Sequence, residues 1–472
     1  MIEQIEISTE LQQLVSSSLA WEKRIIPKDC DNTSIEFYTD IEIIDDDVIN
    51  ELEIIYNRHV KFKIINSSSF LKALNKYFRK KNNDKFVLKI SNENFIYNLI
   101  QEAEEYRCSD IHIEPYENSA RIRYRIDGKL IEKYVLDDKE YPILLNKIKI
   151  KSNIDIAEKR LPQDGRINYV NNEKKFDIRV SVLPTLYGEK AVLRLLSKDT
   201  TNIDINSLGL TQEQLKDYLL GIKKPHGIIL ISGPTGSGKT TTLYATLKLL
   251  NSIESNILTI EDPIEYTLDG INQVQLKESI GLTFSSALRT FLRQDPDIIM
   301  LGEIRDGETA QMAIRAALTG HLVLSTIHTN SAWGTISRLI DMGVPSFLLA
   351  NTMNLSVAQR LVRLLCPNCK KESKTIDREI PDSLRKYKFP QIEFTAIGCP
   401  DCFYTGYAGR KAVYEVIPID TELSKCIKSN DHEISTQLKE RNIKSVSESA
   451  FNLFYNGITS YDEILPILIS NE

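Results

Sequence analysis

The pattern of hydrophobic and polar positions changes along the chain, and each change indicates a different kind of structure. Residues 1–78 mix short apolar runs with the acidic triplet Asp45–Asp47, and they end in a predicted helix, Ser69–Phe78. The polar segment Arg79–Lys85 follows, and it has no apolar side chain to bury, which predicts a linker. We therefore expect a small N-terminal domain at residues 1–85.

Residues 86–200 are predicted to form an α+β domain. A helical pattern over Asn94–Arg107 gives way to segments such as Ile111–Glu114 and Ala120–Ile126, where apolar and polar residues alternate with the period of two that is typical of strands. The segment Ser197–Leu210 is rich in Asp, Asn, Thr and Ser, so it predicts a second linker.

The pattern changes again in residues 201–472, where a helix capped near Thr211 precedes a series of short apolar strands that alternate with helices. This alternation predicts an α/β domain with a mainly parallel sheet. The expected strands are Gly227–Ile231, Ile257–Ile260, Ile298–Leu301 and Leu322–Ser325.

Composition and charge narrow the possible partners. The chain has 472 residues, of which 42% are hydrophobic and 26% charged, and this excludes collagen-like, low-complexity and wholly disordered proteins. A net charge of -6 argues against a chain-wide electrostatic grip on nucleic acid. The N-terminus carries acids where a signal peptide needs bases, and the uncharged stretches Ala316–Ser337 and Met342–Gln359 are too polar for membrane spans. We expect a cytoplasmic protein that meets membranes only through partners.

A phosphate-loop motif is the strongest chemical signal. It fits G-x-x-x-x-G-K-[ST], follows a predicted strand and opens a predicted helix, which is the context that the motif requires. Its backbone N–H groups and the helix N-terminus would bind the polyphosphate of ATP, Lys239 would reach the β- and γ-phosphates, and Thr240 would hold Mg²⁺. The motif consists of Gly233, Pro234, Thr235, Gly236, Ser237, Gly238, Lys239 and Thr240.

Carboxylates after two further strands are candidates for splitting the bound triphosphate. Asp297–Glu303 is a predicted buried strand ending in an acid, but Gly302 stands where the generic second nucleotide motif carries Asp. We therefore expect Mg²⁺ to be held by Thr240 and, through water, by Glu303 or another acid. Glu261 is the best such acid, although its acidic cluster could also be a solvated turn.

Two histidines flank the next predicted strand. His328 follows this strand and His321 precedes it. Because the strand comes next in order after the one that ends at Glu303, either histidine is a candidate for the γ-phosphate or for coupling between subunits. An ordinary structural histidine is the alternative.

Four of the seven cysteines form two C-x-x-C pairs separated by 29 residues. Their thiolates could close a tetrahedral S₄ site for Zn²⁺, and the alternatives are a redox pair, an iron–sulfur cluster or cysteines that bind nothing. Cys30, Cys108 and Cys426 are expected to be small buried or partly buried side chains. The quartet, in a predicted subdomain at about residues 360–410, is Cys366, Cys369, Cys399 and Cys402.

Together these motifs resemble the secretion ATPases that drive type II secretion and type IV pilus assembly, the GspE/PilB type. The resemblance covers about residues 86–472. It rests on the phosphate loop, the acidic cluster around Glu261, and the segments Ser109–Pro115, Arg160–Arg166, Gly302–Asp306, Thr319–His321 and His328–Asn330.

The resemblance implies a RecA-like motor domain after the α+β domain, a homo-hexamer, and ATP bound between the two domains. It also implies that residues 1–85 dock on cytoplasmic or membrane-anchored partners. Arg179 and Arg194 match positions that reach the nucleotide phosphates, where a guanidinium can neutralise developing charge; without the resemblance, both would be taken for solvated side chains. The cysteine quartet resembles the assembly branch of the family, although Lys411-Ala412 replaces a usual Thr-Gly.

The resulting hypothesis is a cytoplasmic hexameric ATPase, bound to an inner-membrane platform protein, that powers assembly of a type IV pilus or a type II secretion pseudopilus. Its expected cofactors are ATP, Mg²⁺ and Zn²⁺, and direct nucleic-acid binding is not expected. Two alternatives are a nucleic-acid translocase or helicase on a similar core, and a nucleotide-gated scaffold with negligible hydrolysis.

Overall fold

The computed structural model describes residues 14–78 (apart from 32 and 42–44), 95–137, 139–171, 174–196, 204–374, 380–431 and 434–469, with Ile7 and Leu11. They group into two compact units: Met1–Lys89 with Cys366–Tyr407, and Ile90–Leu365 with Ala408–Glu472. The predicted linker Arg79–Lys85 and residues 197–203 of the second predicted linker lie outside the described residues. The predicted domain boundaries stay predictions.

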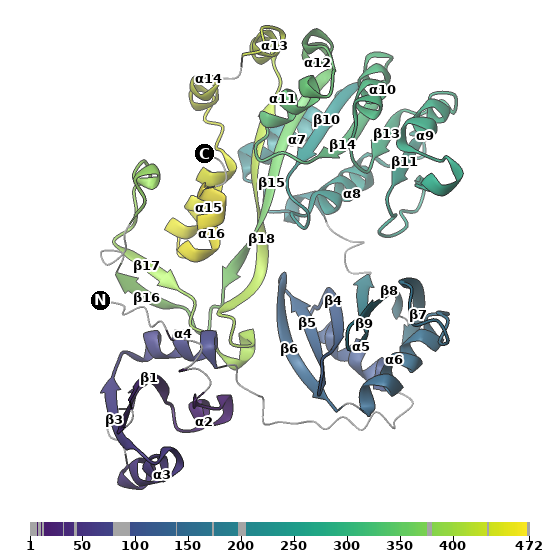
Figure 1. Ribbon diagram of the computed structural model, residues 1–472. Coiled ribbons are helices and arrows are strands. Elements are labelled where there is room, and N and C mark those ends of the chain that lie inside the picture. The colour runs from purple at the N-terminus through teal and green to yellow at the C-terminus, as the bar shows by residue number, and fades with distance from the viewer. Residues whose placement is uncertain are drawn as a thin grey trace. The chain divides into compact units, whose positions relative to one another are not determined.

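The first unit begins with a three-stranded sheet of order β1-β2-β3, in which β1 and β2 are antiparallel and β2 and β3 are parallel (Figure 1). Alternate residues of β2 are buried, and Ile35 and Phe37 pack in one core with Phe70 of α4. The predicted helix Ser69–Phe78 is therefore present. The elements are α2 (Ser17–Glu22), β1 (Ile26–Cys30), β2 (Ser34–Thr39), α3 (Asp46–Tyr56), β3 (His59–Ile64) and α4 (Ser67–Tyr77).

The cysteine-bearing part of the first unit is small. It consists of a two-stranded antiparallel pair, β16 (Lys371–Lys374) and β17 (Ile392–Thr395), and a short 3-10 turn at Pro400–Cys402. A two-stranded pair is marginally stable in water by itself, so this part needs further stabilisation.

A six-stranded antiparallel sheet of order β6-β5-β4-β9-β8-β7 follows in the second unit. Helices α5 and α6 pack with it, and the Tyr124 hydroxyl of β5 donates to the Leu99 carbonyl of α5, 3.2 Å away. The predicted helix and alternating strands are thus confirmed. The elements are α5 (Phe95–Glu105), β4 (Asp110–Pro115), β5 (Ala120–Ile126), β6 (Lys129–Leu136), α6 (Glu140–Lys151), β7 (Gln163–Asn171), β8 (Lys174–Thr185) and β9 (Gly188–Leu196).

The larger sheet of the second unit has seven strands in the order β12-β11-β13-β14-β10-β15-β18. Every pairing from β12 to β15 is parallel, as predicted. The strands are β10 (Gly227–Ser232), β11 (Ile257–Glu261), β12 (Asn272–Gln275), β13 (Ile298–Leu301), β14 (Leu322–Ile327), β15 (Met353–Leu365) and β18 (Tyr407–Pro418).

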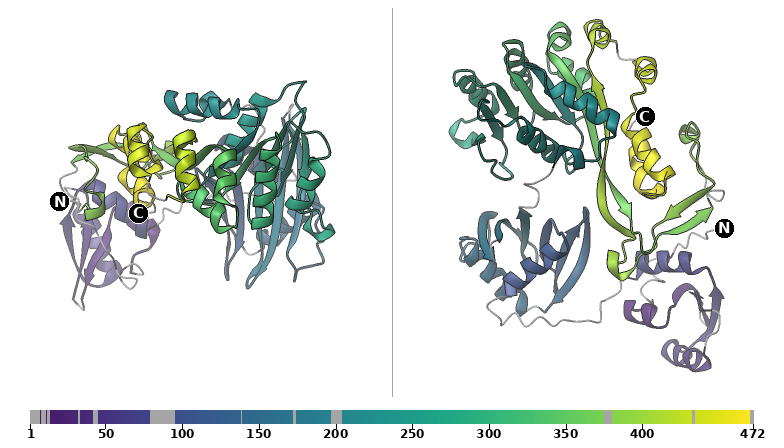
Figure 2. Two further views of the ribbon diagram at one scale, coloured as in Figure 1. Left: turned by 90° about the horizontal axis from the view of Figure 1, so that it is seen from above. Right: turned by 180° about the vertical axis from the view of Figure 1, so that it is seen from behind.

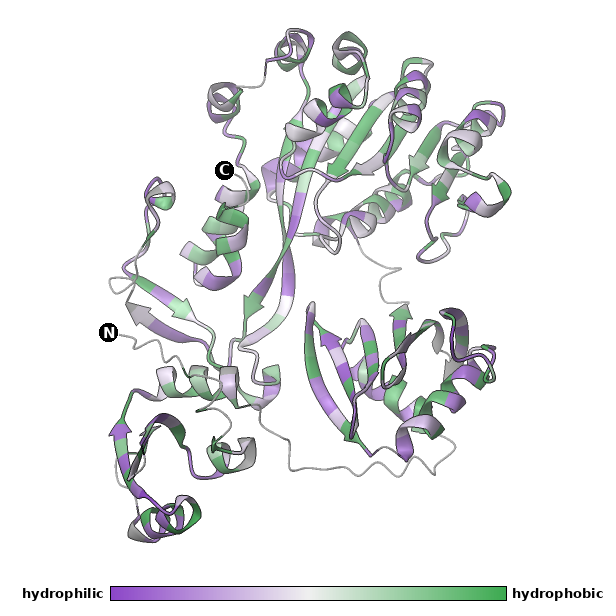
Figure 3. Ribbon diagram, viewed as in Figure 1, coloured by the Kyte–Doolittle hydropathy of each residue, from purple (hydrophilic) through white to green (hydrophobic). Residues whose placement is uncertain are grey.

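Helices cover both faces of this sheet (Figure 2), which explains why the central strands β10, β11, β13 and β14 are buried along their whole length. In Figure 3 the central strands β10 and β13 are mostly hydrophobic, whereas β5 of the antiparallel sheet alternates. The helices are α7 (Gln212–Ile222), α8 (Lys239–Leu250), α9 (Phe284–Phe291), α10 (Gly307–Leu318), α11 (Gly334–Asp341), α12 (Ser346–Thr352), α13 (Thr421–Lys428), α14 (Ser435–Glu440), α15 (Val446–Tyr455) and α16 (Tyr461–Ile469).

Helix boundaries and membrane character agree with the sequence patterns. Thr211 caps α7 in a capping box with Gln214, as the sequence predicts. Among the helices that the structure describes, none has the length and apolar character needed to cross a bilayer.

Candidate nucleotide site and four-cysteine cluster

The phosphate loop joins β10 to α8, and its backbone conformation requires glycine. Gly233 has φ +149° and Gly238 has φ +88°. A Cβ atom at Gly233 would lie 2.5 Å from the Gln359 carbonyl oxygen, and one at Gly238 would lie 2.9 Å from the Gln359 side-chain nitrogen. A side chain at Gly233 would displace the β15 backbone, and one at Gly238 would displace the Gln359 side chain. Glycine at both positions therefore lets the loop pack closely against β15.

Gln359 on β15 supports the loop through hydrogen bonds of its side chain. Its side-chain nitrogen donates to the Ser237 carbonyl at 2.8 Å, and its side-chain oxygen accepts from the Thr242 hydroxyl at 2.9 Å. All three residues are buried. No local sequence pattern predicted this support, although Gln359 ends an uncharged stretch.

Lys239 lies over the loop, and its side chain is largely buried. Its Nζ donates to the carbonyl oxygens of Gly233 at 2.8 Å and Pro234 at 3.1 Å. Burial lowers the pKa of Lys239, and the nearby Glu303 carboxylate acts in the opposite direction. A cation that is held this way can transfer its hydrogen bonds to phosphate oxygens.

Glu303 directly follows Gly302 at the end of β13, and its carboxylate is bound from two sides. One oxygen accepts from Arg305, and the other lies 3.3 Å from Nε2 of His328. The side chain is 19% exposed. The acid is therefore fixed in direction while one edge stays open to a water molecule.

Close strand packing explains why Gly302 has no side chain. A Cβ there would lie 3.3 Å from both the Glu261 Cα and the Ile260 carbonyl oxygen. The Gly302 N–H also donates to that carbonyl at 2.8 Å. An aspartate here would need the β11 backbone to move by a few tenths of an ångström, which glycine avoids.

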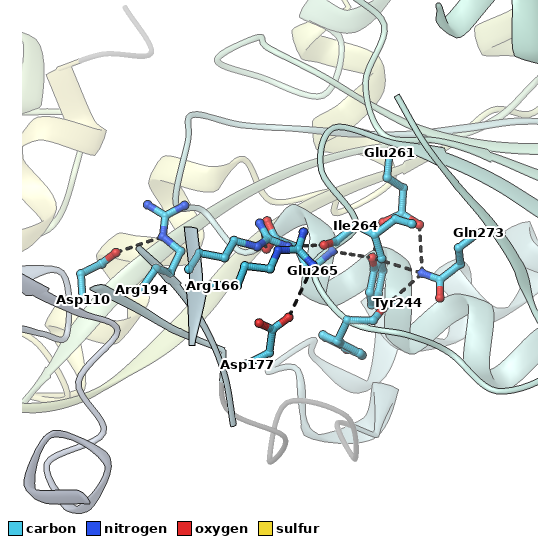
Figure 4. A network of polar contacts seen from close by, with 11 residues as sticks. Asp110, Arg166, Asp177, Arg194, Tyr244, Glu261, Ile264, Glu265 and Gln273 are labelled. Atoms are coloured by element: carbon cyan, nitrogen blue, oxygen red, sulfur yellow. Dashed lines mark hydrogen bonds and ion pairs between the residues drawn. The ribbon is translucent and has the colours of Figure 1, made fainter. Parts of the chain in front are cut away.

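Glu261 ends β11 and is only 3% exposed, so it is not part of a solvated turn. Its carboxylate accepts three hydrogen bonds, from Tyr244, from Thr259 at 2.6 Å and from Gln273 at 3.0 Å (Figure 4). These three donors fix the direction of the Glu261 carboxylate, whose remaining lone pair can orient a water or a hydrated cation.

Arg194 and Arg179 lie side by side in the antiparallel sheet but have different partners. Arg194 donates to Asp110 at 3.0 Å (Figure 4). Arg179 instead donates to the Ile264 carbonyl and approaches Glu265 at 3.4 Å. Each guanidinium is held by oxygen atoms of the chain. Both could therefore exchange these oxygens for those of a phosphate.

A cavity of about 970 Å³ brings most of the predicted residues together. Arg179 and His321 are not among its lining residues, although Arg194 and His328 are. His321 precedes β14, where its Nδ1 lies 2.9 Å from the Ala316 carbonyl oxygen, so the two histidines occupy opposite ends of one strand. The predicted residues in the lining are Thr235, Gly236, Ser237, Gly238, Lys239, Thr240, Glu261, Glu303, His328 and Arg194.

Arg360 is a further buried charge that the sequence did not predict. It is 7% exposed and donates to the carbonyl oxygens of Gln359 at 3.0 Å and Asn330 at 3.1 Å. Burial lowers its pKa, and the charge of Glu415 raises it. Arg360 thus ties β15, which supports the phosphate loop, to the segment that follows His328.

The four predicted cysteines converge. The Sγ atoms of Cys366 and Cys399 lie 3.9 Å apart, those of Cys369 and Cys402 lie 3.7 Å apart, and those of Cys399 and Cys402 also lie 3.7 Å apart. A tetrahedron with Zn–S distances of about 2.3 Å has sulfur atoms about 3.8 Å apart. The arrangement fits a closed S₄ metal site.

Backbone amides surround this cluster. The N–H groups of Gly398, Cys399 and Gly406 point at its sulfur atoms, at donor–acceptor distances of 3.2–3.4 Å. N–H groups of this kind commonly donate hydrogen bonds to the sulfur ligands of a metal and orient them. The other three cysteines are buried or partly buried, as predicted.

Comparison with known proteins identifies relatives of the chain. A family model described as "Type II/IV secretion system protein" matches residues 88–466. The putative type II secretion system protein E of Escherichia coli (strain K12) is 46% identical over 374 residues, which cover 78% of this chain and 75% of that protein. The type IV pilus assembly ATPase PilB of Myxococcus xanthus is 45% identical over 379 residues, which cover 78% of this chain and 66% of that protein.

Solved structures share the fold. The Legionella pneumophila ATPase DotB matches with a TM-score of 0.61 at 22% identity, covering 80% of this chain and 96% of that one. The pilus retraction motor PilT, solved with bound ADP, matches with a TM-score of 0.54 at 26% identity, covering 79% of this chain and 96% of that one. These findings confirm the predicted resemblance, the predicted fold class and the prediction of a secretion or pilus-assembly ATPase.

Proposed function

Because the chain belongs to the type II/IV secretion system protein family, we propose that it is a homo-hexameric cytoplasmic ATPase that powers assembly of a type IV pilus or a type II secretion pseudopilus. Its relatives include a type II secretion system ATPase E of Vibrio cholerae and a type IV pilus assembly ATPase. We further propose that force passes to an inner-membrane platform protein, and that residues 1–85 dock on another protein of the machine.

One observation supports hydrolysis most directly: Glu303 faces the phosphate-loop cavity while Arg305 and His328 hold its carboxylate. Such an acid can orient the attacking water and accept its proton. A scaffold that only binds nucleotide would not need a carboxylate fixed in this way.

The other site residues support binding and charge balance. Lys239 would bind the β- and γ-phosphates, and the loop N–H groups would bind the remaining phosphate oxygens. Thr240 would hold Mg²⁺, which supplies further positive charge when bound, and Glu261 would hold water in its coordination shell. Arg194 and Arg179 would complete the charge around the transferred phosphoryl group.

We also propose that Cys366, Cys369, Cys399 and Cys402 bind a structural Zn²⁺. The sulfur spacing fits zinc, and the chemistry of four thiolates favours it over Mg²⁺ or Ca²⁺. Among the described residues, these four thiols alone form the ligand group at this place, and four ligands complete a tetrahedral zinc site, which supports a structural rather than a catalytic metal.

Replacement of Glu303 by Gln tests the proposed hydrolysis, with the exposed Glu254→Gln as a matched control. We expect ATP turnover to fall by about 10²–10⁴-fold in the Glu303 variant, because the amide cannot accept the proton, while binding of a non-hydrolysable ATP analogue is kept. The control should match the parent.

The proposal is wrong if Glu303→Gln turns over ATP as fast as the parent. Stimulation of turnover by DNA or RNA would instead favour the translocase. Binding without measurable turnover in the parent, in the presence of its membrane partners, would favour the nucleotide-gated scaffold.

A further inference from the structure

Three arginines form a row across the antiparallel sheet. Arg166 on β7 lies directly opposite Arg179 on β8, and Arg179 lies directly opposite Arg194 on β9. Because opposite residues of antiparallel strands share one face, the three guanidinium groups emerge on the same side of the sheet. We call these three residues the arginine row.

Repulsion within the arginine row lowers the stability of the sheet. Like charges placed directly opposite each other destabilise a sheet. On the far side of Arg194, the next opposite residues are Asp110 on β4 and Arg125 on β5. Asp110 lies 3.0 Å from Arg194 and 3.5 Å from Arg125. Asp110 therefore serves two arginines at once, and the positive charge of the row is only partly balanced there.

Arg166 is the least firmly held member of the row. Its distance of 4.0 Å to an Asp177 oxygen is at the limit of an ion pair, whereas Arg194 lies 3.0 Å from Asp110. A cavity of about 580 Å³ is lined by all three arginines together with Asp164, Ser181 and other residues. The arrangement is one that an anion with several oxygens would stabilise.

We propose that Arg166 is a third phosphate-binding residue, which contacts the polyphosphate of the nucleotide alongside Arg179 and Arg194. The inference rests on the proposed ATPase function. Guanidinium groups pair with phosphate oxygens through two parallel hydrogen bonds, and a polyphosphate offers enough oxygens for more than one arginine. Binding of this anion removes the repulsion within the row and replaces the long contact with Asp177.

The competing interpretation is structural: Arg166 and Asp177 form an exposed ion pair and nothing more. The two interpretations predict opposite effects for Asp177→Asn. If the pair is only structural, Asp177→Asn and Arg166→Gln have the same effect. If Arg166 binds phosphate, removal of the aspartate charge leaves the row more positive, so nucleotide affinity is kept or increased.

The experiment compares Arg166→Gln, Asp177→Asn and the parent full-length protein, with the exposed Arg160→Gln as the matched control, since the Arg160 side chain is 88% exposed. The measurements are kcat and KM for ATP, and the Kd of inorganic tripolyphosphate. We expect Arg166→Gln to lower kcat/KM and tripolyphosphate affinity by about tenfold or more, as for the loss of one charge-assisted hydrogen bond. Asp177→Asn should not weaken either, and Arg166→Lys should restore part of the loss.

Thermal unfolding of each variant separates binding from folding. Equal losses of affinity in Arg166→Gln and Asp177→Asn, or a Kd unchanged in Arg166→Gln, would overturn the inference. Failure of this inference can be distinguished from failure of the proposed function. If the proposed function is wrong, the parent itself hydrolyses no ATP and Glu303→Gln changes nothing. An Arg166→Gln variant that behaves as the parent, in a protein that does hydrolyse ATP, refutes only the third arginine.

Discussion

The phosphate loop is held by hydrogen bonds to a neighbouring core strand, whereas the four-cysteine cluster lies in a part of the chain with little regular secondary structure. Gln359, Thr242 and two obligatory glycines fix the loop between two core strands. The cysteines lie beside a two-stranded pair and a short turn, which is too little structure to be stable without help.

The difference corresponds to two roles of a bound ligand: one that the protein acts on, and one that stabilises the fold. A loop that is already in place binds a ligand in order to act on it, and loss of a functional side chain should leave the fold intact. If the four thiolates bind the proposed zinc ion, the metal adds folding energy to this part of the chain, so loss of one ligand should lower stability before it affects activity.

Replacement of Lys239 should have the largest effect on activity and a small effect on stability. Lys239→Ala removes the cation that reaches the phosphates, so we expect ATP turnover to fall by at least about 100-fold. Lys248→Ala, at an exposed position on the same helix, is the matched control. The measurements are turnover and the midpoint of thermal unfolding. Turnover within twofold of the parent would contradict the assignment of the loop.

Replacement of Cys399 should have the opposite profile. Cys399→Ser removes one of four ligands, so we expect zinc content to fall from about one ion per chain to near zero and thermal unfolding to occur several degrees lower. Elemental analysis and thermal unfolding measure this, with Cys426→Ser as the control. Iron in place of zinc, or unchanged metal content, would refute the zinc site. If turnover falls as far as in Lys239→Ala, the cysteine cluster affects activity as directly as the phosphate loop does, and the assigned difference between the two sites is wrong.

The sequence predicted the elements because their hydrophobic periods are local. The parallel strands, the phosphate loop and the cysteine pairs all depend on residues within a short stretch, and the structure has them where the patterns indicate. Glu303 was found from the strand that precedes it.

Long-range contacts could not be predicted in the same way. The support of Ser237 by Gln359 joins residues 122 positions apart, and no local pattern encodes it. The alternation of β7, β8 and β9 indicates which residues share a face, but only the register places Arg166, Arg179 and Arg194 in one row.

A buried carboxyl near the loop supplies the smallest and most specific prediction. Glu415 on β18 is 4% exposed, accepts a hydrogen bond from the Ala332 N–H at 3.3 Å, and lies near Arg360. Burial raises its pKa to about 7, although the backbone hydrogen bonds and the charge of Arg360 oppose this shift. Between its ordinary value of about 4.3 and about 7, the folded protein keeps a proton that the unfolded chain has lost, so stability falls as the pH rises through this window.

Glu415→Gln should remove this penalty, since the amide is always neutral and still offers an oxygen to Ala332. We expect the midpoint of thermal unfolding to rise by about 2–4 °C relative to the parent at pH 8, and by less at pH 5, where the parent carboxyl is already protonated. Glu254→Gln, at an exposed position, should show no such pH dependence. Equal shifts at both pH values would mean that Glu415 is not protonated in the folded protein. A larger gain at pH 8 than at pH 5 would show that the folded protein buries the charge of the Glu415 carboxylate at high pH, and that this charge lowers its stability.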